Sequence, residues 1–142
     1  MLNLEKSIII DRPIEEVFAF VANSENRPKW VSVVEVQKTS AGPIAVGTTF
    51  RNMGKMMGRQ WESLLEVVEY LPNKRYTFKS TGWPFPCQLR HVFDPVAGGT
   101  QVTLTLEARL DGFFKLVEPF MVGASQRQME TDLVALKNCL EV

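Results

Sequence analysis

The single histidine of the chain, His91, is the side chain best suited to proton transfer near neutral pH. Alternation along its predicted strand places His91 on the same face as Leu89 and Phe93, and we expect this face to point into the interior. A histidine there could act as a general base or bind a ligand through a hydrogen bond. No Ser, Cys or carboxylate is linked to His91 by a motif, so a structural histidine, bonded to a neighbouring polar group, is the favoured interpretation.

Two neighbouring predicted strands carry aromatic side chains and hydroxyl groups on one face. Apolar walls with a few polar groups are typical of pockets for small hydrophobic molecules, and equally of a filled core. Small residues midway along the C-terminal segment would leave room for a ligand beneath a helix. The predicted ligand-binding set consists of Trp61, Ser63, Tyr76, Phe78, Leu89, His91, Phe93, Phe120 and Ala124.

Several other kinds of chemistry are not indicated. The chain has no glycine-rich phosphate loop, no HExxH motif and no close carboxylate pair in a helical register, so we expect neither a nucleotide cofactor nor a metal. Sixteen basic and sixteen acidic residues give formal neutrality without a basic cluster, so nucleic acid is not an expected partner. The two cysteines, Cys87 and Cys139, are too few for a disulfide framework, which favours a reducing cytoplasm. Charge-free runs stay short of the roughly 18 apolar residues that span a bilayer, so no membrane span is expected.

The elements that must position these residues begin with a strand and two short helices. The β-branched run in residues 3–11 predicts a strand. Apolar residues at helical spacing predict a helix over residues 13–22, with Asp11 as its N-cap and Pro13 in its first turn. The polar segment 23–30 is expected to form a second short helix or turn that anchors Trp30.

The middle of the chain, residues 31–110, changes from a period of 3.6 to a period of 2. Turn signals separate the alternating stretches, which predicts consecutive antiparallel hairpins. The six strands are expected at residues 31–40, 48–55, 60–70, 75–81, 87–94 and 101–110.

The last residues, 111–142, return to helical spacing and predict one long helix. Pro119 lacks an amide hydrogen, so we expect a kink or a broken first segment near Lys115. The charged residues of this helix are expected to form its solvated face. They include Lys115, Glu118, Arg127, Glu130, Asp132 and Lys137.

Simple dimensions then limit the architecture. Seven strands at about 4.8 Å spacing make a sheet roughly 30 Å wide, whereas a helix with its side chains is about 10–12 Å across. One helix cannot cover a flat sheet of that width, so the sheet must curl around it. The expected class is α+β, a curved seven-stranded antiparallel sheet around a long C-terminal helix. The gap between them is either filled by side chains or left as a pocket.

This order of elements resembles the helix-grip fold of the SRPBCC superfamily, whose members include START, birch pollen allergen and polyketide cyclase/dehydrase relatives. The resemblance covers nearly the whole chain and is carried by IIIDRPIEEVFAFVANSENRPKW, VGTTF, LLEVVEYLPNKRYTF, DPVAGGTQVTLTLEARL and METDLVALKNCLE. It implies a single ligand-binding domain over residues 1–142 that binds or transports a lipid, isoprenoid or polyketide-like molecule. The shared residues of such a family mostly build its scaffold, so they indicate the fold better than the chemistry.

The resemblance leaves two alternatives to binding. In a cyclase or aromatase, the pocket would orient a flexible chain while His91, Tyr76 or Ser63 moves protons. In an interaction module akin to co-chaperone or ribosome-associated toxin relatives, the Met-rich turn at residues 53–59 and the loop with Trp83 and Phe85 would bind a macromolecule. A homodimer is compatible with all three functions.

Overall fold

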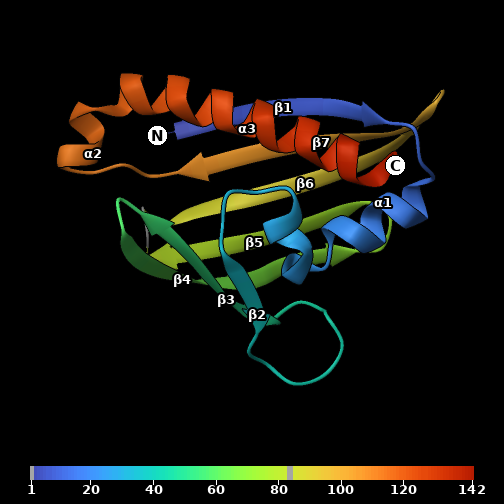
Figure 1. Cartoon of the computed structure of the whole chain (residues 1–142), viewed down its shortest axis with the longest axis horizontal. Helices are drawn as coiled ribbons and strands as arrows, with labels where there is room; N and C mark the ends of the chain where they lie inside the picture. Colours follow the sequence, from blue (N-terminus) through green and yellow to red (C-terminus); the bar gives the residue numbers. More distant parts are fainter. Residues whose placement is uncertain (1, 83–84) are drawn as a thin grey trace.

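The structure, a computed structural model, describes residues 2–82 and 85–142, except for the side chain of residue 56. In this part of the chain, seven strands form one antiparallel sheet that curves past a long helix, α3 (Glu118–Leu140) (Figure 1). The shorter helices are α1 (Ile14–Val21), the 3-10 helix η1 (Ser24–Lys29) and α2 (Phe113–Leu116). The strands are β1 (Leu2–Ile10), β2 (Glu35–Lys38), β3 (Thr49–Met56), β4 (Arg59–Leu71), β5 (Arg75–Gly82), β6 (Cys87–Val96) and β7 (Gly99–Ala108).

The sheet order β1-β7-β6-β5-β4-β3-β2 confirms the predicted run of hairpins. Strands β2 to β6 each pair with the next strand along the chain, and β1 closes the order by pairing with β7 from Leu2↔Ala108 to Ile10↔Thr100. Helix α3 lies along β1, while α1 packs on β6 and β7 near the C-terminal end of α3 (Figure 1). The predicted α+β helix-grip architecture is therefore confirmed.

The strand predicted at residues 31–40 is shorter than expected, because its first part completes the preceding helix. The Val31 amide donates to the Arg27 carbonyl at 2.7 Å, and the Val33 amide donates to the Val31 carbonyl at 2.8 Å. These amides are therefore not available for a β-ladder, and β2 begins only at Glu35.

Proline lies at the start of α1 and at the start of α3, and the prediction is wrong for the N-cap of α1 and confirmed for the break before α3. Asp11 is not the N-cap of α1: Pro13 holds that position, and the Asp11 amide instead donates to Glu141 Oε2 at 2.8 Å near the end of α3. The break expected near Lys115 is present, since α2 ends at Leu116 and Pro119 lies in the first turn of α3. An amide hydrogen has no helical partner in the first turn, so proline is tolerated there.

The core lies between the sheet and the helices, and its buried residues include Phe18 of α1, Tyr76 of β5 and Phe93 of β6. Helix α3 contributes Met129, Leu133 and Leu136, which recur at the spacing of one helix face. Among the described residues, no helix has both the length and the apolar composition needed to cross a bilayer.

Candidate functional site

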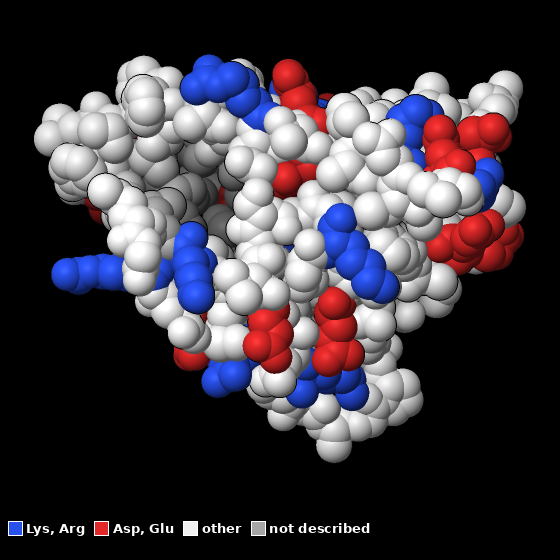
Figure 2. All heavy atoms as spheres, viewed as in Figure 1, with Lys and Arg blue, Asp and Glu red and all other residues white. Residues whose placement is uncertain are grey.

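A cavity of about 280 Å³ lies between the inner face of the sheet and the middle of α3. Figure 2 shows the surface hollowed between the α2–α3 region and the tip of the β3–β4 hairpin, where the cavity opens. Pockets that bind small molecules measure roughly 300–1,000 Å³, so this one lies just below that range. Its walls are formed by Arg27, Asn52, Leu65, Phe78, Ser80, Phe85, Cys87, Leu89, Leu106, Ser125, Gln128, Met129 and Asp132.

The register of the sheet explains why these strand residues share the cavity. Phe78 pairs with Leu89, which in turn pairs with Leu106, and residues directly opposite each other point to the same face. Ser80 and Cys87 form the next pair on that face, nearer the opening. We call this region of the sheet and the facing part of α3 the open end.

Two of the predicted ligand-binding residues, Phe78 and Leu89, line the cavity. Ser63 is buried beside it, where its hydroxyl accepts a hydrogen bond from Asn52 Nδ2 at 3.2 Å. Trp61 lies across the backbone of Gly54 on the neighbouring strand, because a Cβ added at Gly54 would meet the indole Cζ2 at 2.2 Å. Ser63 and Trp61 therefore support the wall of the cavity rather than form it.

Three further predicted residues, Tyr76, His91 and Phe93, lie deeper along the same strands, in a region that we call the closed end. All three are at most 2% exposed, and none of them lines the cavity. Phe93 packs against the ring of Phe18 from α1, with ring centres 5.1 Å apart. The Tyr76 hydroxyl shares a hydrogen bond of 2.5 Å with Ser24 of η1, and burial raises the pKa of Tyr76 to about 12.

His91 is neutral at the closed end. Its Nδ1 lies 2.8 Å from the Tyr76 carbonyl oxygen, which can only accept, so Nδ1 carries the proton and donates. Burial, together with the nearby charge of Arg27, lowers the pKa of His91 to about 3. A histidine with this pKa is a poor general base near neutral pH. The geometry thus agrees with the structural interpretation of His91.

Phe120 and Ala124 also require correction. Phe120 is 75% exposed, since it precedes Met129 by about two and a half helical turns and so lies on the opposite side of α3. Ala124 is half-buried and is not part of the cavity wall. The residues of α3 that line the cavity are Ser125, Gln128, Met129 and Asp132, which are spaced along one face.

Sequence reasoning missed the two charged residues of the cavity, Arg27 and Asp132. Arg27 is only 8% exposed, and its guanidinium carbon lies 4.9 Å from the ring centre of Phe78 and 5.8 Å from that of Trp30. Asp132, expected on the solvated face, is half-buried and accepts a hydrogen bond from Gln128 Nε2 at 2.7 Å. Burial raises the pKa of Asp132. The spacing of Asp132 from Met129 and Gln128 was the signal that could have placed it inward.

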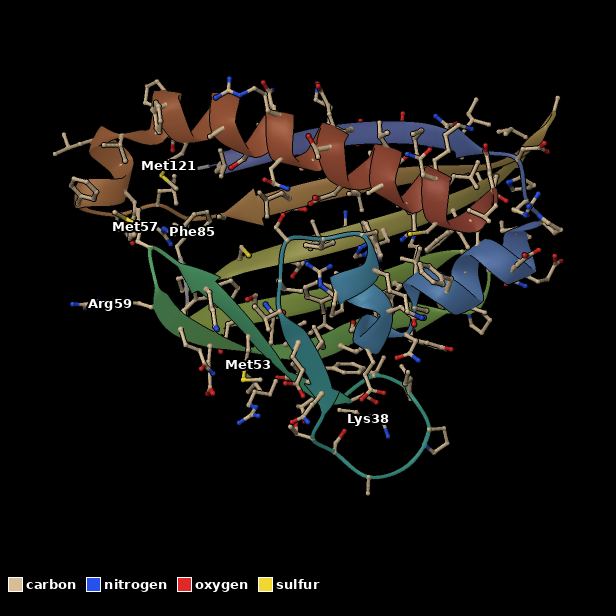
Figure 3. All side chains as sticks on the ribbon, in the orientation of Figure 1. Lys38, Met53, Met57, Arg59, Phe85 and Met121 are labelled. Carbon is tan, nitrogen blue, oxygen red and sulfur yellow. The ribbon has the colours of Figure 1, made fainter. Side chains whose placement is uncertain are left out.

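The described parts of the two segments that were considered as a surface for a macromolecule, the turn at residues 53–59 and the loop with Phe85, lie at the open end. Phe85 lines the cavity and contacts Phe114 edge-on, with ring centres 5.8 Å apart, whereas Trp83 and Pro84 fall outside the described residues. Figure 3 shows Phe85, Met57 and Met121 at this same end of the molecule. Met57 and Gly58, with φ of 52° and 80°, form an ordinary tight hairpin turn in which the Met57 side chain is 96% exposed.

No group of three or more His, Cys, Asp or Glu side chains that could hold a metal ion occurs within residues 2–82 and 85–142. The polar groups of the cavity are thus a guanidinium, a carboxyl, two amides, two hydroxyls and a thiol. Such a set can orient a small molecule inside an apolar wall.

Known proteins of the same architecture support this description. The structure of TTHA0849 from Thermus thermophilus is 24% identical, with a TM-score of 0.77 over 96% of this chain and 95% of that one. NE0264 from Nitrosomonas europaea is 18% identical, with a TM-score of 0.79 over 99% and 94%. The di-domain ARO/CYC protein BexL from the BE-7585A biosynthetic pathway is 18% identical, with a TM-score of 0.75 over 99% of this chain and 50% of that one. These likenesses establish the helix-grip fold.

The family follows from the sequence itself. A family model described as polyketide cyclase / dehydrase and lipid transport matches residues 1–141. The chain therefore belongs to the polyketide cyclase/dehydrase and lipid transport family. A search of curated proteins finds no match to the chain.

Proposed function

We propose that this protein binds a hydrophobic small molecule, such as a lipid, an isoprenoid or a polyketide-like compound, in the cavity of the open end. The observation that carries the proposal is the cavity itself, which has apolar side chains on both the sheet and α3 and a few polar groups between them. An apolar hollow exposes surface to water that a hydrophobic guest would cover, which favours binding.

Binding is better supported than catalysis, because the candidate catalytic side chains are not suited to proton transfer or nucleophilic attack near neutral pH. His91 is neutral and faces the closed end, and burial raises the pKa of Tyr76 to about 12, so neither is tuned to exchange protons near neutral pH. The thiol on the cavity wall, Cys87, has its pKa raised by burial, which disfavours the nucleophilic thiolate.

A cyclase or aromatase is the second candidate. It is favoured by the description of the family model and by the di-domain ARO/CYC proteins among the similar structures. Such an enzyme would act mainly by holding a flexible chain in a reactive conformation. In this chain the proton-moving groups would have to be those of the cavity wall, above all Asp132, rather than His91.

We also infer a single domain, and a cytoplasmic location from the two free thiols, Cys87 and Cys139. All the residues that line the cavity belong to one chain, so binding does not require a second copy. A homodimer is compatible with the proposal.

The test is a titration with Nile red, a neutral apolar dye, in which fluorescence reports binding. We expect Ser125→Trp, which places an indole in the cavity, to abolish dye binding while the chain stays folded by circular dichroism. Val134→Trp is the matched control, because Val134 lies on the same helix and is 52% exposed. Equal dye binding by the two variants would contradict the proposal.

A further inference from the structure

The guanidinium of Arg27 is a buried cation in which two of the three nitrogen atoms have no hydrogen-bond partner among the described residues. Its Nε and Nη1 atoms are inaccessible to solvent and have no acceptor among the residues that the structure describes. Removing a charged group from water is costly unless hydrogen bonds or an opposite charge replace the lost solvation. Buried polar groups that remain unpartnered call for a specific explanation, and a ligand is one of these.

The surroundings of Arg27 compensate this cost only in part. The rings of Phe78 and Trp30 attract the cation through their π-systems, but aromatic rings do not replace acceptors for the N–H groups. Asp132 is the carboxylate of the described cavity wall, and it forms no ion pair with Arg27 within 4.0 Å, accepting instead from Gln128. The cavity wall is thus largely apolar, with a guanidinium at its edge whose Nε and Nη1 donors have no acceptor among the described residues.

The other titratable groups that face Arg27 do not neutralise it. They are Tyr76, Cys87 and His91; burial raises the pKa of the first two and lowers that of His91, so all three are uncharged near neutral pH. Asp132 therefore supplies the opposing charge, at a distance. An anion that entered the cavity could lie closer to Arg27 than Asp132 does.

We propose that the ligand of this cavity is an amphipathic carboxylate whose anionic group is bound by Arg27 and whose apolar body lies against Phe78, Leu89 and Leu106. This proposal rests on the proposed function, and it adds the chemical class of the ligand. A charge-assisted hydrogen bond between guanidinium and carboxylate is stronger than one between neutral groups, and it gains further where water is excluded. Asp132 limits this gain, because it repels the same carboxylate.

The experiment measures displacement of Nile red by acids and by matched alcohols that lack the charge. The pairs are decanoic acid with decanol, and naphthoic acid with naphthalenemethanol, so that a flexible chain and an aromatic body are tested separately. We expect the acid to bind about tenfold or more tightly than its alcohol in at least one pair. The pair that shows the preference identifies the apolar body.

Two variants assign the preference to the charged residues. Arg27→Met keeps a long apolar side chain and should bring the ratio of acid to alcohol affinity to about one. Asp132→Asn keeps the shape and removes the repulsion, so it should increase the ratio. A purely structural Arg27, balanced by Asp132, would leave the ratio unchanged in both variants.

The outcomes separate this proposal from the proposed function. Equal binding of acids and alcohols by the native protein, or an acid preference that survives in Arg27→Met, overturns the carboxylate proposal and leaves the hydrophobic cavity standing. Failure of Nile red and of all four compounds to bind overturns both.

A second measurement keeps the proposal falsifiable even where Arg27→Met does not fold. The preferred acid, labelled with ¹³C at its carboxyl carbon, is titrated by NMR while bound to the native protein. Beside a guanidinium the pKa of the bound acid should lie below that of the free acid, whereas burial without a cation should raise it. A raised pKa overturns the proposal.

Discussion

The closed end and the open end are built from the same strands and yet differ in packing. On β6, His91 and Phe93 are 1% and 2% exposed, whereas Leu89, on the same face, is half-buried on the wall of a cavity. Alternation along a strand decides which face a side chain occupies, but what covers that face decides whether the space is filled. At the closed end α1 packs on β6 and β7, and Phe18 inserts between Tyr70 and Phe93. At the open end the sheet faces the middle of α3 and Phe85, and a cavity remains between them.

The largest effect on stability is expected from removal of the Phe93 ring at the closed end. Phe93→Ala should lower the free energy of unfolding by about 3–5 kcal/mol, because it removes a buried ring from a filled region and leaves a cavity. Leu89→Ala is the control from the same strand face and should cost less than about 2 kcal/mol, since Leu89 already borders empty space. Urea unfolding measures both, and a Leu89→Ala cost equal to that of Phe93→Ala would contradict the distinction.

A smaller effect is expected from pH at the closed end. Because the pKa of His91 is about 3 in the folded chain and 6.5 is its ordinary value, the unfolded chain binds a proton in this window that the folded chain does not. The stability that the folded chain gains from holding His91 neutral is therefore complete above about pH 6.5 and is lost as pH falls toward about 3. Between about pH 7 and pH 4.5 the loss should be about 2 kcal/mol.

The control for this prediction is His91→Gln, which keeps a side-chain N–H for the Tyr76 carbonyl but does not titrate. Urea unfolding at the two pH values should show a decrease in stability in the native protein that is about 2 kcal/mol greater than in the variant. Other groups titrate in both proteins, so the difference isolates His91. Parallel behaviour would mean that His91 is solvated and that the closed end is not sealed.

A weaker effect is expected at the hydrogen bond that ties η1 to the sheet. Tyr76→Phe removes the partner of the buried Ser24 hydroxyl and should cost about 1–2 kcal/mol. Adding Ser24→Ala should recover part of this loss, because the stranded hydroxyl is removed as well. Thermal or urea unfolding of the double variant tests whether the Ser24–Tyr76 pair ties η1 to the closed end, and an additive double loss would argue against this coupling.

The smallest effect is expected at Phe120. Phe120→Ala should change stability by no more than about 0.5 kcal/mol and should leave Nile red binding unchanged, because the side chain is 75% exposed. Unfolding and dye titration of this variant check the assignment of the outer face of α3. A loss of dye affinity in Phe120→Ala would contradict this assignment and indicate that Phe120 contacts the bound dye.

The fold could be predicted from the sequence because each element leaves a local signal. Alternation gave the strands and their inner faces, and the limited width of one helix required a curved sheet. The missed details depend on interactions across the chain. Asp11 does not cap α1 because the helix begins at Ile14 with Pro13 at the N-cap position, and β2 starts late because Val31 and Val33 complete the turn after η1.

The sequence predicts which face of the sheet a site residue occupies, but not whether it lies at the open end or the closed end. Tyr76 and Phe78 share one face of β5, but nothing in the alternation tells which of them meets a filling helix and which meets a hollow. Phe120 fits an apolar stripe at helical spacing, but within α3 it lies half a turn out of phase with Met129, and the sequence does not show which of the two stripes faces the sheet. Arg27 belongs to a polar 3-10 helix without periodicity, so its burial depends on tertiary packing alone.

The most direct test of the ligand cavity is NMR of the protein with ¹³C-labelled methyl groups in the presence of decanol. We expect intermolecular NOEs from the alkyl chain to the methyl groups of Leu89, Leu106 and Met129 at the open end, and none to Val17 or Leu136 of the buried core. Contacts confined to exposed methyl groups, or no NOEs at all at saturating decanol, would contradict the account.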